Sequence, residues 1–250
     1  MKHAAIFLTL FLEPLLMAQE PVNEDAVAIL DRIDSLYLSE TASSKIRLYV
    51  FRPDFQWSYN LEWYSRGRNN AFVRINSPLD YRGRAILKVG KEMWFYNPKE
   101  DRVSQMSRAG ALRRFLQSEF SRDDFMKINR LSEEYNVNMR QMETTLRLTL
   151  TPKMITPIVW DKIVFEVDQE TLSPLEKIYF NERGRISKKL VYSKPVEING
   201  KMVPTVLEMT SYQFKNYRSR IEYLDLQLDG PIKPHIFSMK HLKNLLYEEQ

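Results

Sequence analysis

The chain has 250 residues, a net charge of +5 and 44% hydrophobic residues, so it can bury a substantial core and is not a disordered chain. The complete lack of cysteine excludes disulfides, thiol chemistry and a lipid anchor on a cysteine. Short runs rich in β-branched and aromatic residues, with 12% aromatics and seven glycines, predict a sheet-rich globular protein.

The N-terminal residues follow the order of a secretory signal. Lys2 and His3 precede the apolar run "AAIFLTLFL", and "EPLLMA" then ends in a small residue at Ala18. The apolar run is too short to span a bilayer as a helix. We therefore expect residues 1–18 to be a signal peptide and residues 19–250 to form a single soluble domain, without a stable membrane anchor, in a bacterial periplasm.

Residues 23–40 have apolar side chains at helical spacing, with Asn23 placed to cap the first turn, and they predict an amphipathic helix. From Lys45 onward the period changes to two, which indicates β-strands separated by turns. The expected strands of this first group are residues 46–51, 55–67, 70–78, 83–90 and 91–98. The simplest arrangement of such strands is an antiparallel meander.

The second of these strands has one aromatic face and one polar face. The apolar side chains on the first face are Phe55, Trp57, Tyr59, Leu61 and Trp63. Two interpretations remain open: the aromatics fill a closed core, or they line an apolar cavity. In either case we expect Trp57 and Trp63 to behave alike when substituted, because they lie on the same face.

Helical character returns over residues 107–131, interrupted at Ser121. Glu119 and Asp123 have the spacing of an acid/base pair on one helix, but a break at Ser121 separates them. Ser121 and Asp124 match the Ser-x-x-Asp form of a capping box, which predicts two short helices and a structural role for these acids. The apolar sides of both helices are expected to lie on the aromatic face of the sheet.

Strand patterns resume after this region, and the chain is expected to close with a short helix over residues 235–246. The later strands are expected at residues 135–143, 144–152, 162–169, 174–181, 185–193, 202–212 and 218–229. Basic residues occur in pairs far apart in the sequence, which favours solvated surface positions over nucleic-acid binding. These pairs are Arg66/Arg68, Arg82/Arg84, Arg113/Arg114 and Lys188/Lys189.

The sequence shows no arrangement typical of a catalytic centre. The predicted mature chain has His235 and His241, whose spacing is not that of a helical metal pair. No nucleophile with a partner histidine, no glycine-rich phosphate loop and no zinc site is visible. We therefore predict no catalytic residues, no metal and no cofactor.

Two motifs resemble the hallmark region of the outer-membrane lipoprotein-sorting family, the LolA-like periplasmic carriers. The first is "GRAILKVGKEMWFYNPKEDRVSQMS", in which the matching residues are Gly90, Trp94, Tyr96, Pro98 and Val103. The second is "FLQSEFSRDDF", which resembles the family's Gly-Ser-Asp-Phe-Ser-Tyr-Glu-Asp signature at Ser118, Glu119, Phe120, Ser121, Asp123 and Asp124. The general layout extends the resemblance from Val22 to Leu245. Gln117 replaces the signature's glycine, and Arg122 replaces its aromatic residue.

The resemblance implies a mainly β protein with helices (α+β), an incomplete antiparallel β-barrel whose concave apolar face is covered by helices acting as a lid. It implies a monomer that carries acyl chains of lipoproteins or other lipids from an inner-membrane donor transporter to an outer-membrane acceptor. The expected cavity residues are Phe55, Trp57, Tyr59, Leu61, Trp63 and Trp94, and the expected lid residues are Phe115, Leu116, Phe120 and Phe125. Two alternatives stay open: a module that senses envelope lipid or lipoprotein and signals to a membrane partner, and a lipid hydrolase.

Overall fold

The computed structural model describes residues 24–126, 130–153 and 159–243. The expected signal peptide and the expected cap Asn23 lie outside these residues. The described helices are α1 (Glu24–Asp34), α2 (Arg108–Ala111), α3 (Arg122–Met126), α4 (Leu131–Glu134) and α5 (Met239–Lys243), with short 3-10 helices η1 (Leu79–Tyr81) and η2 (Pro234–Phe237). None of the helices in this part of the chain is long and apolar enough to cross a membrane.

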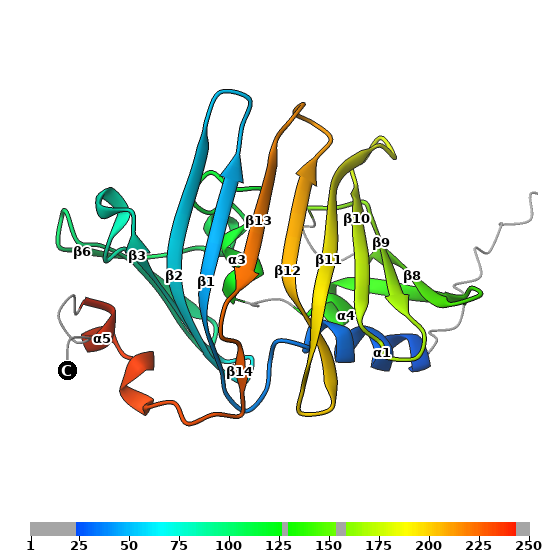
Figure 1. Cartoon of the computed structure of the whole chain (residues 1–250), viewed down its shortest axis with the longest axis horizontal. Helices are drawn as coiled ribbons and strands as arrows, with labels where there is room; N and C mark the ends of the chain where they lie inside the picture. The colour runs from blue at the N-terminus through cyan, green and yellow to red at the C-terminus, as the bar shows by residue number, and fades with distance from the viewer. Residues whose placement is uncertain (1–23, 127–129, 154–158, 244–250) are drawn as a thin grey trace, which may run out of the picture.

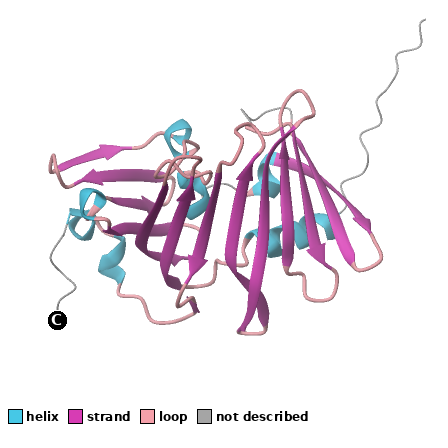
Figure 2. Ribbon diagram, turned by 45° about the horizontal axis from the view of Figure 1, so that its top comes forward, coloured by secondary structure: helices cyan, strands magenta, loops and turns pink. Residues whose placement is uncertain are grey.

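The strands form one antiparallel sheet, shown from two directions in Figures 1 and 2. Those that precede α2 in the chain are β1 (Ala42–Phe51), β2 (Gln56–Arg66), β3 (Asn70–Ser77), β4 (Ala85–Val89), β5 (Glu92–Asn97) and β6 (Arg102–Gln105). Those that follow α4 are β7 (Tyr135–Gln141), β8 (Thr145–Pro152), β9 (Lys162–Asp168), β10 (Pro174–Phe180), β11 (Ile186–Ile198), β12 (Lys201–Ser211), β13 (Arg218–Tyr223) and β14 (Gln227–Leu228). Short β6 adds to the expected strands, and the strand expected at residues 218–229 is split into β13 and β14.

The order of the strands leaves the barrel open. The sheet has 14 strands in the order β6-β5-β4-β3-β2-β1-β13-β12-β11-β10-β9-β8-β7, and β14 pairs with β1 off this path. Neighbours along this path are also neighbours in sequence, except at the junction of β1 with β13. The free edges are β6 and β7, which follow one another in the chain. This arrangement confirms the incomplete antiparallel barrel that the family resemblance implies.

The two faces of the sheet bury different sets of side chains, because neighbours along a strand point to opposite faces. On what we call the inner face, Trp63 lies opposite Val73, and Val73 lies opposite Ile86. These side chains belong to the main hydrophobic core, which also includes Leu30 and other apolar residues of α1. Figure 2 places α1, α3 and α4 together on one side of the sheet.

The outer face has a smaller core under the C-terminal segment. Phe72, Leu87 and Tyr96 pack there with Leu242 of α5. The imidazole of His241 lies 4.8 Å from the ring of Phe72, centroid to centroid, and the backbone carbonyl of His241 accepts a hydrogen bond from Arg74. The predicted terminal helix is therefore split into η2 and α5, and both pack against β3 and β4.

Acidification is expected to destabilise this C-terminal packing. Burial, the neighbouring Arg74 and then His235 lower the pKa of His241 to about 4 from its ordinary value of 6.5. Between these values the unfolded chain binds more protons than the folded one, so the free energy of unfolding falls as the pH drops below 6.5. Measured from pH 7 to pH 5, this decrease should be smaller in the variant His241→Asn. An identical slope in both proteins would contradict the assignment.

Candidate functional site

Residues 112–126, which we call the plug, cover the inner face of the N-terminal half of the sheet. Three phenylalanines of the plug form a cluster, in which Phe125 lies 5.1 Å from Phe115 and 6.4 Å from Phe120 between ring centroids. All three are buried in the main core. The indole nitrogen of Trp63 donates a hydrogen bond of 2.9 Å to the carbonyl of Phe125. The plug is therefore packed directly on β2.

The first part of the plug is not the helix that its sequence predicts. Helix α2 ends at Ala111, and residues 112–120 form turns and bends, with an isolated antiparallel bridge between Arg114 and Ser121. Leu116 and Gln117 have φ values of +51° and +59°, and the amide of Phe115 donates to the carbonyl of Phe120 at 2.8 Å. Because left-handed residues end a right-handed helix, the chain reverses here and returns Phe120 to the sheet.

Gln117 stands at the position where the LolA-like signature has glycine, and its positive φ gives the physical reason for that glycine. A left-handed non-glycine residue costs about 1–2 kcal/mol, and glycine loses part of this gain through its greater freedom in the unfolded chain. We expect Gln117→Gly to raise the free energy of unfolding by about 0.5–1 kcal/mol. Denaturant unfolding measures this directly, and a destabilised variant would contradict it.

Glu119 fastens the turn to the sheet. Its carboxylate is completely buried and forms ion pairs with Arg52 at 3.1 Å and Arg114 at 3.2 Å. Its amide donates to Oγ of Ser219 at 3.0 Å, and its carbonyl accepts from Nζ of Lys188 at 2.8 Å. We call this set of contacts the Glu119 clasp. Glu119 therefore anchors the plug to the sheet. Its carboxylate is used in ion pairs with two arginines and is not paired with a second acid for acid/base catalysis.

The predicted capping box at the start of α3 is confirmed. The amide of Asp124 donates to Oγ of Ser121 at 3.3 Å, and the amide of Ser121 donates to Oδ2 of Asp124 at 2.7 Å. The hydroxyl of Ser121 also donates to Oδ2 of Asp124, at 2.8 Å. Both residues therefore satisfy free amides at the helix start.

Removal of the cap hydroxyl is expected to destabilise the protein. Ser121→Ala should lower the free energy of unfolding by about 0.5–2 kcal/mol. Ser121→Thr keeps the hydroxyl and should stay close to the parent. Ser121→Asp caps helices well in general, but here it would bring a second carboxylate against Asp124, so we expect it to be less stable than Ser121→Thr. Equal stability of the alanine and threonine variants would contradict the capping role.

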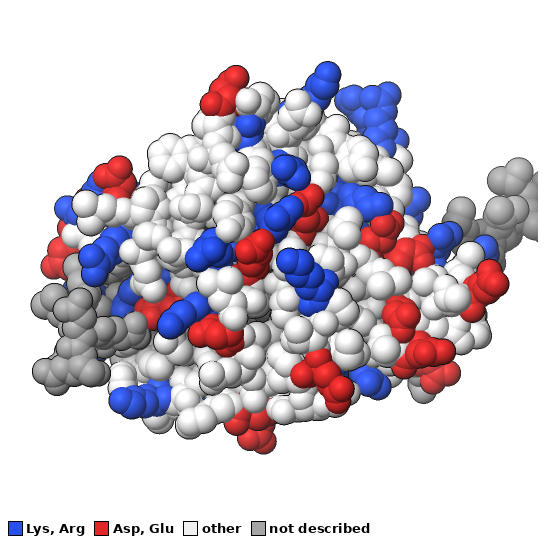
Figure 3. Space-filling view, viewed as in Figure 1, with Lys and Arg blue, Asp and Glu red and all other residues white. Residues whose placement is uncertain are grey.

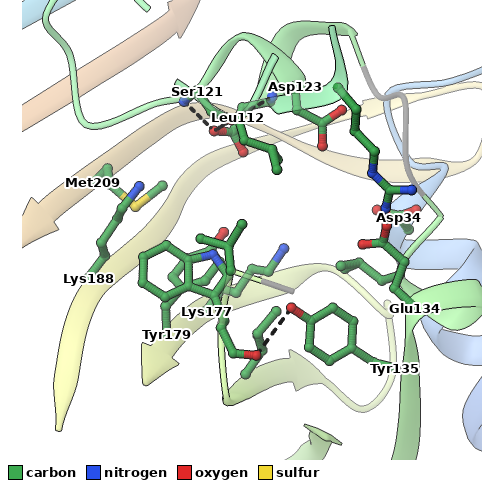
Figure 4. A pocket seen from close by; sticks show the side chains of 16 residues that line it. Asp34, Leu112, Ser121, Asp123, Glu134, Tyr135, Lys177, Tyr179, Lys188 and Met209 are labelled. Atoms are coloured by element: carbon green, nitrogen blue, oxygen red, sulfur yellow. Dashed lines mark hydrogen bonds and ion pairs between the residues drawn. The ribbon is translucent and has the colours of Figure 1, made fainter. Parts of the chain in front are cut away.

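A cavity lies between the plug, α1 and the C-terminal half of the inner face (Figure 4). It consists of two adjoining spaces of about 120 and 40 Å³ that share Asp34, Asp124, Lys177 and Tyr179. In Figure 4, Ser121 and Asp123 of the plug face Tyr179 and Lys177 of β10 across the larger space. Together these spaces are smaller than the roughly 300–1,000 Å³ of a typical ligand pocket.

Tyrosines that are buried or half-buried form much of the wall of the smaller space. These residues are Tyr37, Tyr179, Tyr192 and Tyr223. Burial is the main cause that raises the pKa of each of them above its ordinary value. The hydroxyls therefore stay protonated at physiological pH. The cavity wall combines aromatic rings with neutral hydroxyl groups, a surface that accepts apolar chains and occasional polar atoms.

The charged groups of the cavity have partners within the protein. Asp34 forms an ion pair of 3.2 Å with Arg68, while Asp124 serves the capping box. Nζ of Lys177 lies 4.7 Å from the ring centroid of Phe165, and Nζ of Lys188 lies 5.2 Å from that of Trp160. Burial lowers the pKa of Lys188. These charged side chains therefore interact with other groups of the protein, through an ion pair, a capping hydrogen bond and two cation–π contacts.

The groups that hydrolytic or metal chemistry commonly uses do not meet in this cavity. His235 and His241 lie with η2 and α5 on the outer face of the sheet, away from Ser121. Among the residues that the structure describes, no group of three or more His, Cys, Asp or Glu side chains is placed to hold a metal ion.

The structure brings only part of the predicted site together. Tyr59, Leu61 and Trp63 lie buried on the inner face, with Phe115, Phe120 and Phe125 of the plug in the same core; Leu116 is partly buried against it. Phe120 also lines the smaller cavity space. Phe55 and Trp57 lie outside this core and are 43% and 44% exposed.

Trp94 lies on the other face of the sheet from Trp63. It pairs with Leu87, and Leu87 pairs with Phe72, so all three side chains point outward. Trp94 packs there against the smaller core under the C-terminal segment. Phe95 is the residue of this strand that packs against the main core. An inner wall that contains Trp63 therefore does not contain Trp94.

Sequence reasoning missed the cavity residues of the later strands. Lys177 and Tyr179 on β10, Leu190 and Tyr192 on β11, and Ile221 and Tyr223 on β13 all line the smaller space. Each pair obeys the same period of two that singled out the aromatic face of β2. The two-residue period of these residues is visible in the sequence, but the charged residues mixed into the same strands make the apolar face hard to recognise.

Solved structures share this fold. An outer-membrane lipoprotein-sorting protein domain from Vibrio parahaemolyticus matches with a TM-score of 0.75 and 17% identity, covering 88% of this chain and 99% of that one. A DUF1329 family protein from Desulfovibrio piger matches with a TM-score of 0.77 and 21% identity, over 90% and 100% of the two chains. A LolA superfamily protein from Nitrosomonas europaea matches with a TM-score of 0.71 and 22% identity, over 86% and 98%. No curated protein matches the chain.

The open antiparallel barrel with helices on its inner face is thus a LolA-like fold, as the two motifs predict. A family model described as "Uncharacterized protein"-like matches residues 67–244. This match covers more than half of the chain, and the protein belongs to that family.

Proposed function

We propose that this protein is a periplasmic carrier that binds acyl chains of lipoproteins or other lipids on its inner face and ferries them from the inner to the outer membrane. In this proposal residues 1–18 are the signal peptide and residues 19–250 the carrier domain. An inner-membrane transporter would donate the cargo and an outer-membrane acceptor would take it.

The observation that carries the proposal is the phenylalanine plug on an apolar inner face. The three phenylalanine rings of the plug cover Trp63 and its neighbours as a ligand would. In the chain, the plug lies between β6 and β7, the two edge strands of the sheet. Each methylene moved from water to such a surface contributes about 0.8 kcal/mol. An acyl chain can therefore replace the apolar packing that the inner face gives up when the plug moves aside.

The size of the cavity supports a movement of this kind. Spaces of about 120 and 40 Å³ lie next to the plug, and both include plug residues in their walls. A long acyl chain needs more room than these spaces offer, so binding would extend them at the expense of the plug. Tyr59, Leu61 and Trp63 would then contact the chain in place of Phe115 and Phe125, with Phe120 at the border.

Transfer of a fluorescent lipid between two sets of vesicles tests the carrier. The transfer rate should rise in proportion to protein concentration, and native mass spectrometry of protein from the periplasm should find an acyl species. A sensor would retain the lipid without moving it between vesicles. A hydrolase would release a shortened product.

A matched pair of variants locates the binding surface. Met209 is buried and lines the larger space, whereas Val191 of the neighbouring strand is 40% exposed. Met209→Trp should fill part of the cavity and reduce transfer, while Val191→Trp should leave it unchanged. Thermal unfolding of both variants confirms that they are folded. Equal transfer by both would argue against this cavity as the cargo site.

A further inference from the structure

Two neighbouring hairpins expose aromatic side chains at one end of the sheet. They are the β1–β2 tip, residues 51–57, and the β12–β13 tip, residues 211–218. The most exposed aromatic side chains of the described residues all lie there: Phe55 at 43%, Trp57 at 44%, Tyr212 at 57% and Phe214 at 47%. We call these four the tip aromatics. Exposed aromatic rings that gather at one place mark an interaction surface.

The two tips form one surface, because β1 pairs with β13 up to the pair Phe51 and Arg218. Figure 1 shows both hairpins projecting side by side at the upper end of the molecule. Phe55 packs edge-on against Trp57 at 6.2 Å between centroids, and Phe214 lies 5.2 Å from Tyr217. Each tip thus presents a pair of rings.

Arginines lie directly over rings of these tips. The guanidinium of Arg218 is 4.2 Å from the ring centroid of Phe51, that of Arg52 is 4.3 Å from Tyr217, and that of Arg114 is 5.2 Å from Phe214. Lys215 is a further exposed cation at the second tip, and Asp54 is the one carboxylate within the two tips. Figure 3 shows acidic atoms at the very end of the β1–β2 hairpin, mostly uncharged surface below them, and basic side chains towards the neighbouring tip.

Projecting rings with cations beside them match the interface of a bilayer. Tryptophan and tyrosine favour the headgroup level, where the ring leaves water and its polar atom keeps a partner. Lys215 is exposed, and the side chains of Arg114 and Arg218 are 40% and 47% exposed, so these cations can attract anionic headgroups.

Several backbone amides of the tips already have partners within their own hairpin, since Arg52 donates to the carbonyl of Phe55 and Ser211 donates to that of Tyr217. This lowers the cost of moving the tips out of water. A protein–protein interface has a closely packed, fully buried core within a polar rim, and two projecting tips do not by themselves form such a continuous patch.

We propose that the two hairpin tips dock this protein on a bilayer surface that contains anionic lipids, with the tip aromatics among the headgroups. This docking goes beyond the proposed carrier function, because it needs no cargo. Arg52 and Arg114, which stack on Tyr217 and Phe214, are also the two arginines of the Glu119 clasp. The docked end is therefore the end where the plug is fastened.

Vesicle flotation tests the docking with unlabelled protein and no transferable probe. The wild-type chain should float with vesicles of phosphatidylcholine and phosphatidylglycerol, more weakly at high salt, and much less with phosphatidylcholine alone. The double variant Trp57→Ser with Phe214→Ser should lose vesicle affinity on the order of tenfold or more, because two aromatic rings no longer move from water into the headgroup layer. Trp57→Phe should retain binding and lose the blue shift of tryptophan emission that vesicles induce.

The control is Val191→Ser with Val196→Ser, which removes exposed apolar side chains from β11. It should bind as the wild-type chain does. Equal loss in both double variants, or an undiminished tip variant, would overturn the proposal. A wild-type chain that does not bind anionic vesicles would also overturn the proposal, and a protein partner would then be the alternative occupant of the tips. A chain that docks but transfers no lipid would uphold docking and refute the carrier.

Discussion

Replacing Glu119 with glutamine is expected to lower the free energy of unfolding by about 3–5 kcal/mol, because it leaves two arginines without their buried counter-charge. The Glu119 carboxylate is wholly buried, and the Arg52 side chain is only 5% exposed. Burial lowers the pKa of Arg52 and the Glu119 carboxylate opposes this shift, so the carboxylate offsets part of the cost of burying the guanidinium. Denaturant unfolding of the purified variant measures the loss.

The matched control for this prediction is Glu100→Gln. Glu100 pairs with Arg102 at 3.2 Å, but both side chains are at least half exposed, so its loss should cost less than about 1 kcal/mol. If Glu119→Gln were as mild as Glu100→Gln, the clasp would not hold the plug. A variant that stayed fully stable but lost lipid transfer would instead return a chemical role to Glu119.

The second large effect is expected at Trp63. Trp63→Ala should lower the free energy of unfolding by about 3–5 kcal/mol through lost burial and the void that it leaves. The side chain is 3% exposed, its ring lies 6.3 Å from that of Tyr223, and its nitrogen bonds to Phe125. Trp57→Ala should cost less than about 0.5 kcal/mol, since Trp57 is largely a surface residue.

Titration with a fluorescent fatty-acyl probe separates packing from binding at the same position. Under the proposed function, Trp63→Ala weakens probe binding as well as stability, whereas Trp57→Ala changes neither property. A large loss of stability with unchanged probe affinity would remove Trp63 from the acyl surface. Similar behaviour of both variants would contradict the placement of Trp57 outside the core.

The sequence predicted the two-residue period and the order of the strands well, but it did not predict which side chains along a strand are buried. The alternation in β2 correctly placed Trp57 and Trp63 on the same face, but it carries no information on where the plug ends along that face. Trp57 therefore projects beyond the covered region, although its pattern is identical to that of Trp63. The length of strand that a covering segment reaches is a property of the tertiary structure.

The plug illustrates a second limit of sequence reasoning. The capping box of Ser121 and Asp124 is local, so its residues alone predicted it correctly. The prediction of a helix that reaches Ser121 was wrong, because Leu116 and Gln117 adopt left-handed conformations that neither residue prefers. The long-range contacts of Glu119 with Arg52 and Ser219 compensate for that local cost, and they become visible only once the strands are assembled.

The strand order also has a consequence for how the chain folds. Strands β1 to β6 and β7 to β13 each form a meander of local hairpins, whereas β1 and β13 bring together the two ends of the domain, with Ile46 opposite Tyr223. Closing so long a loop is slow, because its entropy is lost before the contacts form. We therefore expect two halves that collapse early and a late, rate-limiting junction between them. During synthesis, the chain cannot complete its sheet until β13 has emerged, and the edge of β1 needs protection until then.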